Sequence, residues 1–282
     1  MTAPLVLIAA SLLRIPARRI RALVRGEDGA LRDWLANESA TRLAEARRDA
    51  RVIAARLEAL GARVVALDEP TYPAGLRDLG DPPPFLVVLG TLAATERAAG
   101  TAIVGTREPE PSSARAAYDL ATVAPGPIVS GLALGIDAAA HRGALAAGTP
   151  TIAYVAHGFG ATYPPEHAGL EVEIVAAGGA ILTEALPAER VTRWALVRRD
   201  RLQAAHAAVL VLVESDADGG AMHAVAAAER LGRMRYAAHG EGLRFGGNRL
   251  AVTAGAATLA PHLVSTRTWP PAIESPVLAQ PT

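Results

Sequence analysis

The chain has 282 residues, of which 51% are hydrophobic and 20% are charged, a composition that predicts a soluble globular protein and excludes a disordered one. It contains no cysteine and no lysine, so disulfides, thiolate metal ligands, Schiff-base chemistry and a phosphate-loop lysine are excluded. The 28 basic and 28 acidic side chains balance, but arginine is in excess in residues 1–63 and 190–282, and acidic residues are in excess between them. A polyanion would therefore be attracted to the two ends of the chain. The alternative is that these charges are solvated helix faces.

Residues 1–63 are predicted to form a small helical annex. Apolar side chains recur at helical spacing from Leu12 to Val24 and again from Leu43 to Leu57. The apolar run of residues 5–13 is much shorter than the about 20 residues that a membrane-spanning helix needs. We therefore expect a cytoplasmic protein without a membrane segment.

The rest of the chain is predicted to form an α/β core over residues 64–264, followed by a proline-containing tail over 265–282. A short strand is expected at 63–67, and from Phe85 onwards apolar runs alternate with Ala-rich helical stretches. The runs are residues 85–89, 101–104, 128–130, 151–155, 180–182, 209–213 and 235–238. Because they are apolar on consecutive positions, both of their faces should be covered, as in a doubly wound, mostly parallel sheet.

Ligands of such sheets bind at the carboxyl ends of the strands, so the loops there are the candidate sites. The loop after residue 104 reads Gly105-Thr106-Arg107, in which a glycine lets amides approach an anion and an arginine adds charge-assisted bonds. Ser112 and Ser113 are expected to cap the helix that follows. We expect this loop to lie beside the two described next.

The loop after residue 128 carries Ser130, Gly131, Gly135 and Asp137, which suit a phosphate or sugar held over a helix N-terminus; a tight turn with Asp137 as the N-cap is the alternative. A third loop carries Gly219 and Gly220, and could equally be a connection with capping residues only. No dinucleotide fingerprint is present, and the seven histidines lack metal-site spacing, so neither a cofactor nor a metal is expected.

Five arginines, namely 190, 193, 198, 199 and 201, cluster around Asp200 in twelve residues. Arginine binds phosphates bidentately and stacks on bases, which suits a sequence-tolerant binder of single strands. The alternative is a solvated helix that packs Trp194 inward.

Seven short segments in one order resemble the DNA-processing protein DprA family, also called Smf. They are Tyr72-Pro73 with Asp81-Pro82-Pro83, Ala102 to Arg107, Ser130 to Leu145, Tyr163 to Glu166, Arg199 to Arg201, Gly220 to His223, and Gly247 to Leu250. The resemblance covers about residues 5 to 260. It implies a Rossmann-like core and a non-enzymatic homodimer that binds and shields single-stranded DNA and loads the RecA recombinase during natural transformation.

The loops and the resemblance together predict a nucleic-acid-binding site. Its expected members are Gly105, Thr106, Arg107, Ser130, Gly131, Gly135, Asp137, Arg198, Arg199, Arg201, Gly219 and Gly220. Arg107, Arg198, Arg199 and Arg201 are expected to line one basic pocket.

Three positions depart from the family pattern. Leu134 replaces a family arginine, Asp200 replaces an asparagine, and Gly219-Gly220-Ala221 lacks the hydroxyls of the family's Ser-Gly-Ser/Thr loop. These changes should weaken DNA binding by roughly a few kcal/mol in total. Many relatives also end in a winged helix, which the tail of residues 265–282 does not resemble.

Two alternatives remain open. One is a relative that uses the same pocket for a nucleotide-derived ligand, as a sensor or as a phosphoribohydrolase similar to the cytokinin-activating enzymes. Asp218-Gly219-Gly220-Ala221 only half resembles their Pro-Gly-Gly-x-Gly-Thr loop. The other is a paralogue that keeps the fold and has lost ligand binding.

Overall fold

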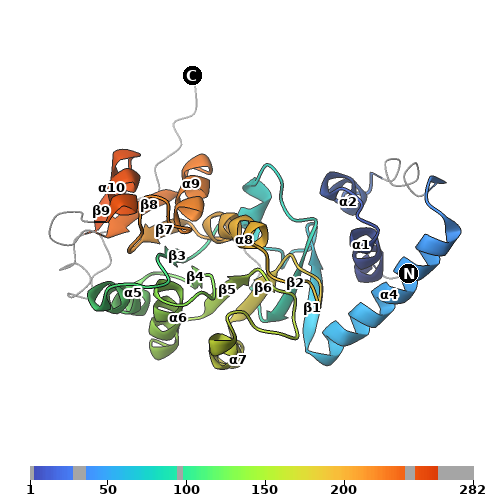
Figure 1. Cartoon of the computed structure of the whole chain (residues 1–282), viewed down its shortest axis with the longest axis horizontal. Helices are drawn as coiled ribbons and strands as arrows, with labels where there is room; N and C mark the ends of the chain where they lie inside the picture. The colour runs from blue at the N-terminus through green and yellow to red at the C-terminus, as the bar shows by residue number, and fades with distance from the viewer. Residues whose placement is uncertain (1–2, 28–35, 94–97, 239–244, 260–282) are drawn as a thin grey trace, which may run out of the picture.

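The computed structural model describes residues 3–27, 36–93, 98–238 and 245–259. A nine-stranded sheet crosses the molecule, with helices on both faces and the N-terminal helices at one end (Figure 1). The strands are β1 Ala62–Ala66, β2 Phe85–Gly90, β3 Thr101–Val104, β4 Ile128–Ser130, β5 Thr151–Val155, β6 Ala180–Thr183, β7 Val209–Leu212, β8 Met234–Ala238 and β9 Ala257–Leu259.

The sheet is mostly parallel, as predicted. Its spatial order is β1-β2-β6-β5-β4-β3-β7-β8-β9. The seven strands from β6 to β9 pair in parallel, whereas β2 is antiparallel to β6 and β1 is antiparallel to β2. Because the chain moves from β3 through β6 in one direction and then returns to β7 on the other side of β3, the sheet has a topological switch point between β3 and β7.

The predicted strands match the observed ones to within a residue at either end. Their side chains enter two separate core layers: Ala102 and Val104 of β3 pack in the layer below α8 and α9, and Ile103 packs in the layer below α5 and α6. Burial on both faces explains why these runs are apolar at every position rather than at every second one.

The helices of the core divide between the two faces of the sheet. α5 Pro111–Val123, α6 Ile136–Ala146 and α7 Ala168–Ala176 lie on one face, and α8 Arg193–His206, α9 Met222–Arg230 and α10 Gly246–Thr253 lie on the other (Figure 1). Two short 3-10 helices, η1 Ala74–Asp78 and η2 Pro165–His167, complete the core.

The start of α5 corrects one prediction. Ser112 and Ser113 are not its N-caps: the helix begins at Pro111, with Glu110 at the N-cap and both serines in the first turn. Proline favours the first helical position because its fixed φ suits the helix and the N–H that it lacks would have no helical partner there. This preference moves the helix start ahead of the serines.

The described part of the annex contains α1 Ala3–Leu12, α2 Ala17–Val24 and α4 Ala40–Ala59. The first predicted helical stretch is helical only from Ala17, as α2 with Pro16 at its N-cap, because α1 ends at Leu12. The second is observed as α4, which Ser39 caps. The domain boundary expected after residue 63 falls inside β1, so the annex runs directly into the sheet. The tail predicted for residues 265–282 lies outside the described residues.

Among the helices that the structure describes, none is long and apolar enough to span a membrane.

Candidate functional site

The loops that follow β3, β4 and β7 meet at the switch point, as predicted. The Thr106 N–H donates to the Glu214 carbonyl at 2.8 Å, and the Ile136 N–H donates to the Thr106 carbonyl at 3.1 Å. These bonds connect the three loops into one surface at the carboxyl ends of the strands.

Three adjoining hollows open on this surface. The switch-point pocket, of about 530 Å³, lies over β3 and β7 and is bordered by Arg107, Asp137 and Gly219. The Tyr163 pocket, of about 70 Å³, is lined mainly by apolar side chains after β4 and β5. The annex cleft, of about 400 Å³, lies between α1 and α2 of the annex and the N-terminal part of α8. Arg199 borders all three hollows.

Arg199 is held firmly by the protein. Its side chain lies on the buried face of α8, and the residue is only 6% exposed. Nη1 donates to the Tyr154 carbonyl at 2.9 Å and lies 3.8 Å from Oδ2 of Asp137, while Nε lies 3.2 Å from Oδ1 of Asp200. Two carboxylates therefore share one buried guanidinium.

Burial makes the charged form of both carboxylates less favourable. Burial raises the pKa of Asp137 although the Arg199 charge lowers it. Burial also raises the pKa of Asp200 to about 6, against the lowering effect of Arg199. At neutral pH an ionised Asp200 beside Arg199 reduces the positive potential that an anion would meet.

Two buried histidines hold the loop that follows β4. His141 Nε2 contacts the Gly131 carbonyl at 2.5 Å and Nδ1 contacts the Thr151 hydroxyl at 2.7 Å, while His167 Nδ1 contacts the Leu132 carbonyl at 2.8 Å. Burial lowers the pKa of His141 to about 4, so this imidazole is neutral at physiological pH. Both side chains position the loop from beneath.

Close packing accounts for three of the glycines predicted in the site. A Cβ at Gly131 would overlap Arg199 and Asp137. Gly135 has a positive φ, and a Cβ there would overlap the Thr106 carbonyl. A Cβ at Gly105 would overlap Ile136. The Ser130 hydroxyl is likewise turned inward and donates to the Ile103 carbonyl at 2.6 Å. These residues build the surface.

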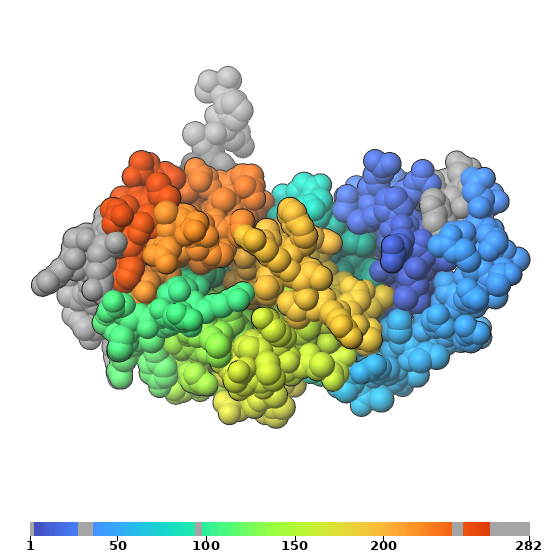
Figure 2. Space-filling view, viewed as in Figure 1, coloured from blue at the N-terminus to red at the C-terminus, as the bar shows by residue number. Residues whose placement is uncertain are grey.

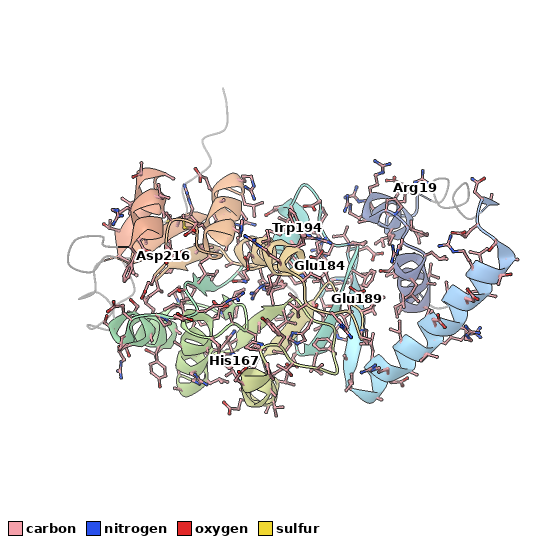
Figure 3. The ribbon with its side chains drawn as sticks, viewed as in Figure 1. Arg19, His167, Glu184, Glu189, Trp194 and Asp216 are labelled. Atoms are coloured by element: carbon pink, nitrogen blue, oxygen red, sulfur yellow. The ribbon has the colours of Figure 1, made fainter. Side chains whose placement is uncertain are left out.

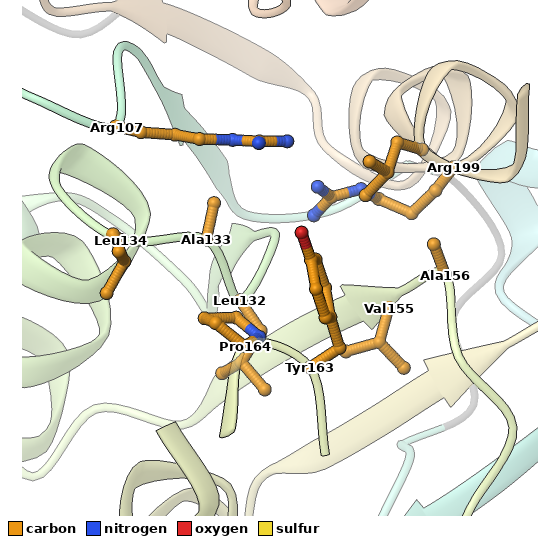
Figure 4. A pocket seen from close by; sticks show the side chains of 10 residues that line it. Arg107, Leu132, Ala133, Leu134, Val155, Ala156, Tyr163, Pro164 and Arg199 are labelled. Carbon is orange, nitrogen blue, oxygen red and sulfur yellow. The ribbon is translucent and has the colours of Figure 1, made fainter. Parts of the chain in front are cut away.

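The four predicted arginines do not share one pocket. Arg107 is exposed, and Figure 4 shows it extending above Ala133 toward the guanidinium of Arg199, with the Tyr163 hydroxyl pointing to the same group. Arg198 and Arg201 instead contact Oε1 of Glu184 at 3.0 and 2.9 Å. Arg198 lines the annex cleft, and its side chain remains 60% exposed.

The switch-point pocket is not a basic one. Besides Arg107, Arg193, Arg199 and His223, it is lined by the acidic residues Glu108, Asp137, Asp200, Asp216 and Asp218. Gly219 and Gly220 lie at this acidic end. The positive charge gathers instead at the other side of the surface, along the N-terminal part of α8.

The predicted site residues left out Tyr163 and Arg193, although the sequence analysis noted both, Arg193 in the arginine cluster and Tyr163 in a segment that resembles the family. The alternative in which Trp194 packs inward is wrong, because the residue is 77% exposed. Trp194 lies in the first turn of α8, whereas the buried residues begin at Arg199 and are concentrated in the C-terminal half of the helix.

Comparisons with known proteins agree with the fold. The family model described as DNA recombination-mediator protein A matches residues 63–264. The DNA processing protein DprA of Mycobacterium tuberculosis is 35% identical over 252 residues, which cover 80% of this chain and 64% of that protein. Protein Smf of Synechocystis is 37% identical over 161 residues, covering 55% and 40% of the two chains. The chain thus spans less than two thirds of these curated relatives.

Two solved structures share the architecture. DNA processing protein A of Streptococcus pneumoniae superimposes with a TM-score of 0.73 at 23% identity, covering 93% of this chain and 96% of that one. DNA processing protein A of Helicobacter pylori, described by its single-stranded DNA binding mode, gives a TM-score of 0.62 at 24% identity, covering 72% and 93%. At these identities the likeness concerns the fold.

Proposed function

Because the chain belongs to the family of DNA recombination-mediator protein A, we propose that it binds single-stranded DNA at the carboxyl edge of its parallel sheet. The observation that carries the proposal is a line of exposed arginines along this edge. Arg107 reaches over the Tyr163 pocket, and Arg193 and Arg198 follow on α8. Guanidinium groups bind phosphates bidentately, which suits a strand held by its backbone.

The proposed path avoids the acidic end of the switch-point pocket. Phosphates would contact Arg107, Arg193 and Arg198, while the positive charge of the buried Arg199 would attract them without direct contact. The Tyr163 pocket offers an aromatic ring and an apolar floor to a base. The family arginine absent at Leu134 is thereby offset by cations that come from α8.

The proposal extends to roles that the family resemblance implies. The protein would act without catalysis, shield the strand, form a homodimer and load RecA during natural transformation. Faster RecA filament formation on a coated single strand would support the loading role, and no effect at saturating protein would contradict it.

Arginine substitutions test the binding proposal. Replacing Arg107 or Arg193 by alanine should weaken oligo-dT binding roughly 10- to 150-fold each, because a hydrogen bond to a charged group contributes about 1.5–3 kcal/mol. Fluorescence anisotropy with labelled oligo-dT measures the dissociation constants. Arg199 is left intact, because truncating it would leave two buried carboxylates unpaired.

Arg51→Ala provides the matched control, since Arg51 is an exposed arginine on α4, in the annex. This variant has the same net charge as the others and should bind like the parent. Equal losses in all three variants would contradict a local site. Tight binding of one nucleotide by a parent protein that does not bind oligo-dT would favour the nucleotide-ligand alternative instead.

A further inference from the structure

Trp194 is a large aromatic side chain left in solvent. It is 77% exposed, more than the other exposed large hydrophobic residues that the structure describes. It lies in the first turn of α8, where the Thr192 hydroxyl accepts from the Ala195 N–H and fixes the helix start. An indole bound to a rigid helix and left uncovered has much apolar area to bury against a ligand.

Two exposed arginines line the same cleft as this indole. Arg190 and Arg198 line the annex cleft together with Trp194, and Arg193 precedes it on α8. Of these, Arg190 and Arg193 form no salt bridge within the described part of the chain. An aromatic face among cations fits a ligand that alternates anionic groups with flat rings.

The acidic groups nearby leave this charge in excess. Glu184 borders the cleft but is neutralised by Arg198 and Arg201. Glu189 also borders it, and Figure 3 shows Glu184, Glu189 and Trp194 on the part of the core that faces the annex. The annex contributes small and apolar side chains to the opposite wall, among them Ile15, Ala17 and Ile20.

We propose that Trp194 is a base-stacking platform, and that it extends the single-stranded DNA site from the Tyr163 pocket into the annex cleft. The inference rests on the proposed function and adds a subsite to it. In Figure 2 the gold atoms of α8 cross the middle of the face, between the green and orange core and the blue annex, so one strand can follow this helix past Arg193 to Trp194. Single strands present free base faces, whereas a duplex stacks them internally.

The test compares strands with and without bases. Trp194→Ala should weaken binding of an oligo-dT of about 20 nucleotides roughly 5- to 150-fold, the range found for loss of one base–aromatic stack. Trp194→Phe should retain most of the affinity, because a phenyl ring also stacks. An abasic oligomer of the same length keeps the phosphates, so its weaker binding should not change with Trp194→Ala.

A direct optical readout is available, because the chain has three tryptophans. In a variant with Trp34→Phe and Trp269→Phe, oligo-dT should quench the fluorescence of Trp194, and the abasic strand should not. Val172→Ala, at an exposed apolar residue of α7, is the control and should not alter binding.

The outcomes separate the two proposals. If the parent binds oligo-dT but Trp194→Ala binds equally well and no quenching occurs, the stacking subsite is wrong and the binding proposal survives. If the parent binds no strand at low salt, both are wrong. Equal weakening of the oligo-dT and abasic strands would also overturn the stacking role, since it would reflect a change in charge or folding.

Discussion

Asp200 is one of the acidic residues whose charge opposes anion binding in the candidate site. It lies 3.2 Å from the guanidinium of Arg199, and its carboxylate also faces Asp137 across that group. Burial raises the pKa of Asp200 from its usual 3.8 to about 6, so the cost of burying the charge exceeds the attraction of Arg199. The carboxylate is therefore a charge that the folded protein bears at a cost.

The sign of its effect on stability follows from proton linkage. The folded protein holds the proton of the Asp200 carboxyl more tightly than the unfolded chain does. The stabilisation that this protonation gives the folded state is therefore fully present below pH 3.8 and is lost as the pH rises through about 6. Asp200→Asn should consequently raise the free energy of unfolding at pH 8 by about 1–3 kcal/mol and have little effect below pH 4. Urea unfolding at both pH values measures the difference.

The same substitution should strengthen oligo-dT binding at pH 8. Parent affinity should rise as the pH falls through about 6, and Asp200→Asn should lose that part of the rise. The difference between the two proteins isolates the contribution of Asp200. A parent and a variant with parallel pH profiles would show that Asp200 does not oppose the ligand.

The elements of the site are locked together by the contact between the β4–α6 loop and α8. Gly131 lies so close to Arg199 that no side chain fits between them, and Arg199 in turn binds the carbonyl at Tyr154 of β5. His141 and His167 hold the loop from the opposite side. The position of α8 over the sheet thus depends on a residue without a side chain.

Gly131→Ala should destabilise the protein by about 1–3 kcal/mol, because the added methyl group must displace Arg199 or Asp137. Gly220→Ala is the matched control: Gly220 has no positive φ and no atom within 4 Å of the added Cβ, so its effect should stay within about 0.5 kcal/mol. Urea denaturation distinguishes the two, and equal stability would refute the packing explanation for Gly131.

The sequence predicts the elements better than their contacts. The strands are predictable because burial on both faces leaves uninterrupted apolar runs, and the gathering of three loops follows from parallel topology. The start of α5 is missed because Pro111 competes with two serines for the helix boundary. The pairing of Arg198 and Arg201 with Glu184 depends on how α8 lies against the end of β6, which no local pattern encodes.

At the scale of the whole molecule, a balanced net charge conceals an uneven surface. The switch-point pocket is lined by more acids than arginines, whereas Arg190, Arg193 and Arg198 gather toward the annex. A strand bound along α8 would neutralise its phosphates with these arginines and Arg107. Electrostatics should then supply much of the affinity, supplemented by stacking.

Affinity for oligo-dT should fall steeply with salt and depend little on base sequence. Four phosphate contacts would give a slope of roughly −3 in log affinity against log salt, since each contact on a single strand contributes about −0.7. Binding titrations over about a sixfold range of NaCl concentration measure the slope. Arg107→Ala should make the slope less steep by about 0.7, the contribution of one contact. A slope near zero for the parent would refute the electrostatic mechanism.

Arg199 borders all three hollows, so a bound group that displaced its guanidinium would change the lining of every one of them. The occupancies of the three hollows would then be energetically coupled. Such coupling is reciprocal. If a base in the Tyr163 pocket changes the affinity of the annex cleft by some factor, a group in the annex cleft changes the affinity of the Tyr163 pocket by the same factor. A single strand would then occupy the three hollows cooperatively.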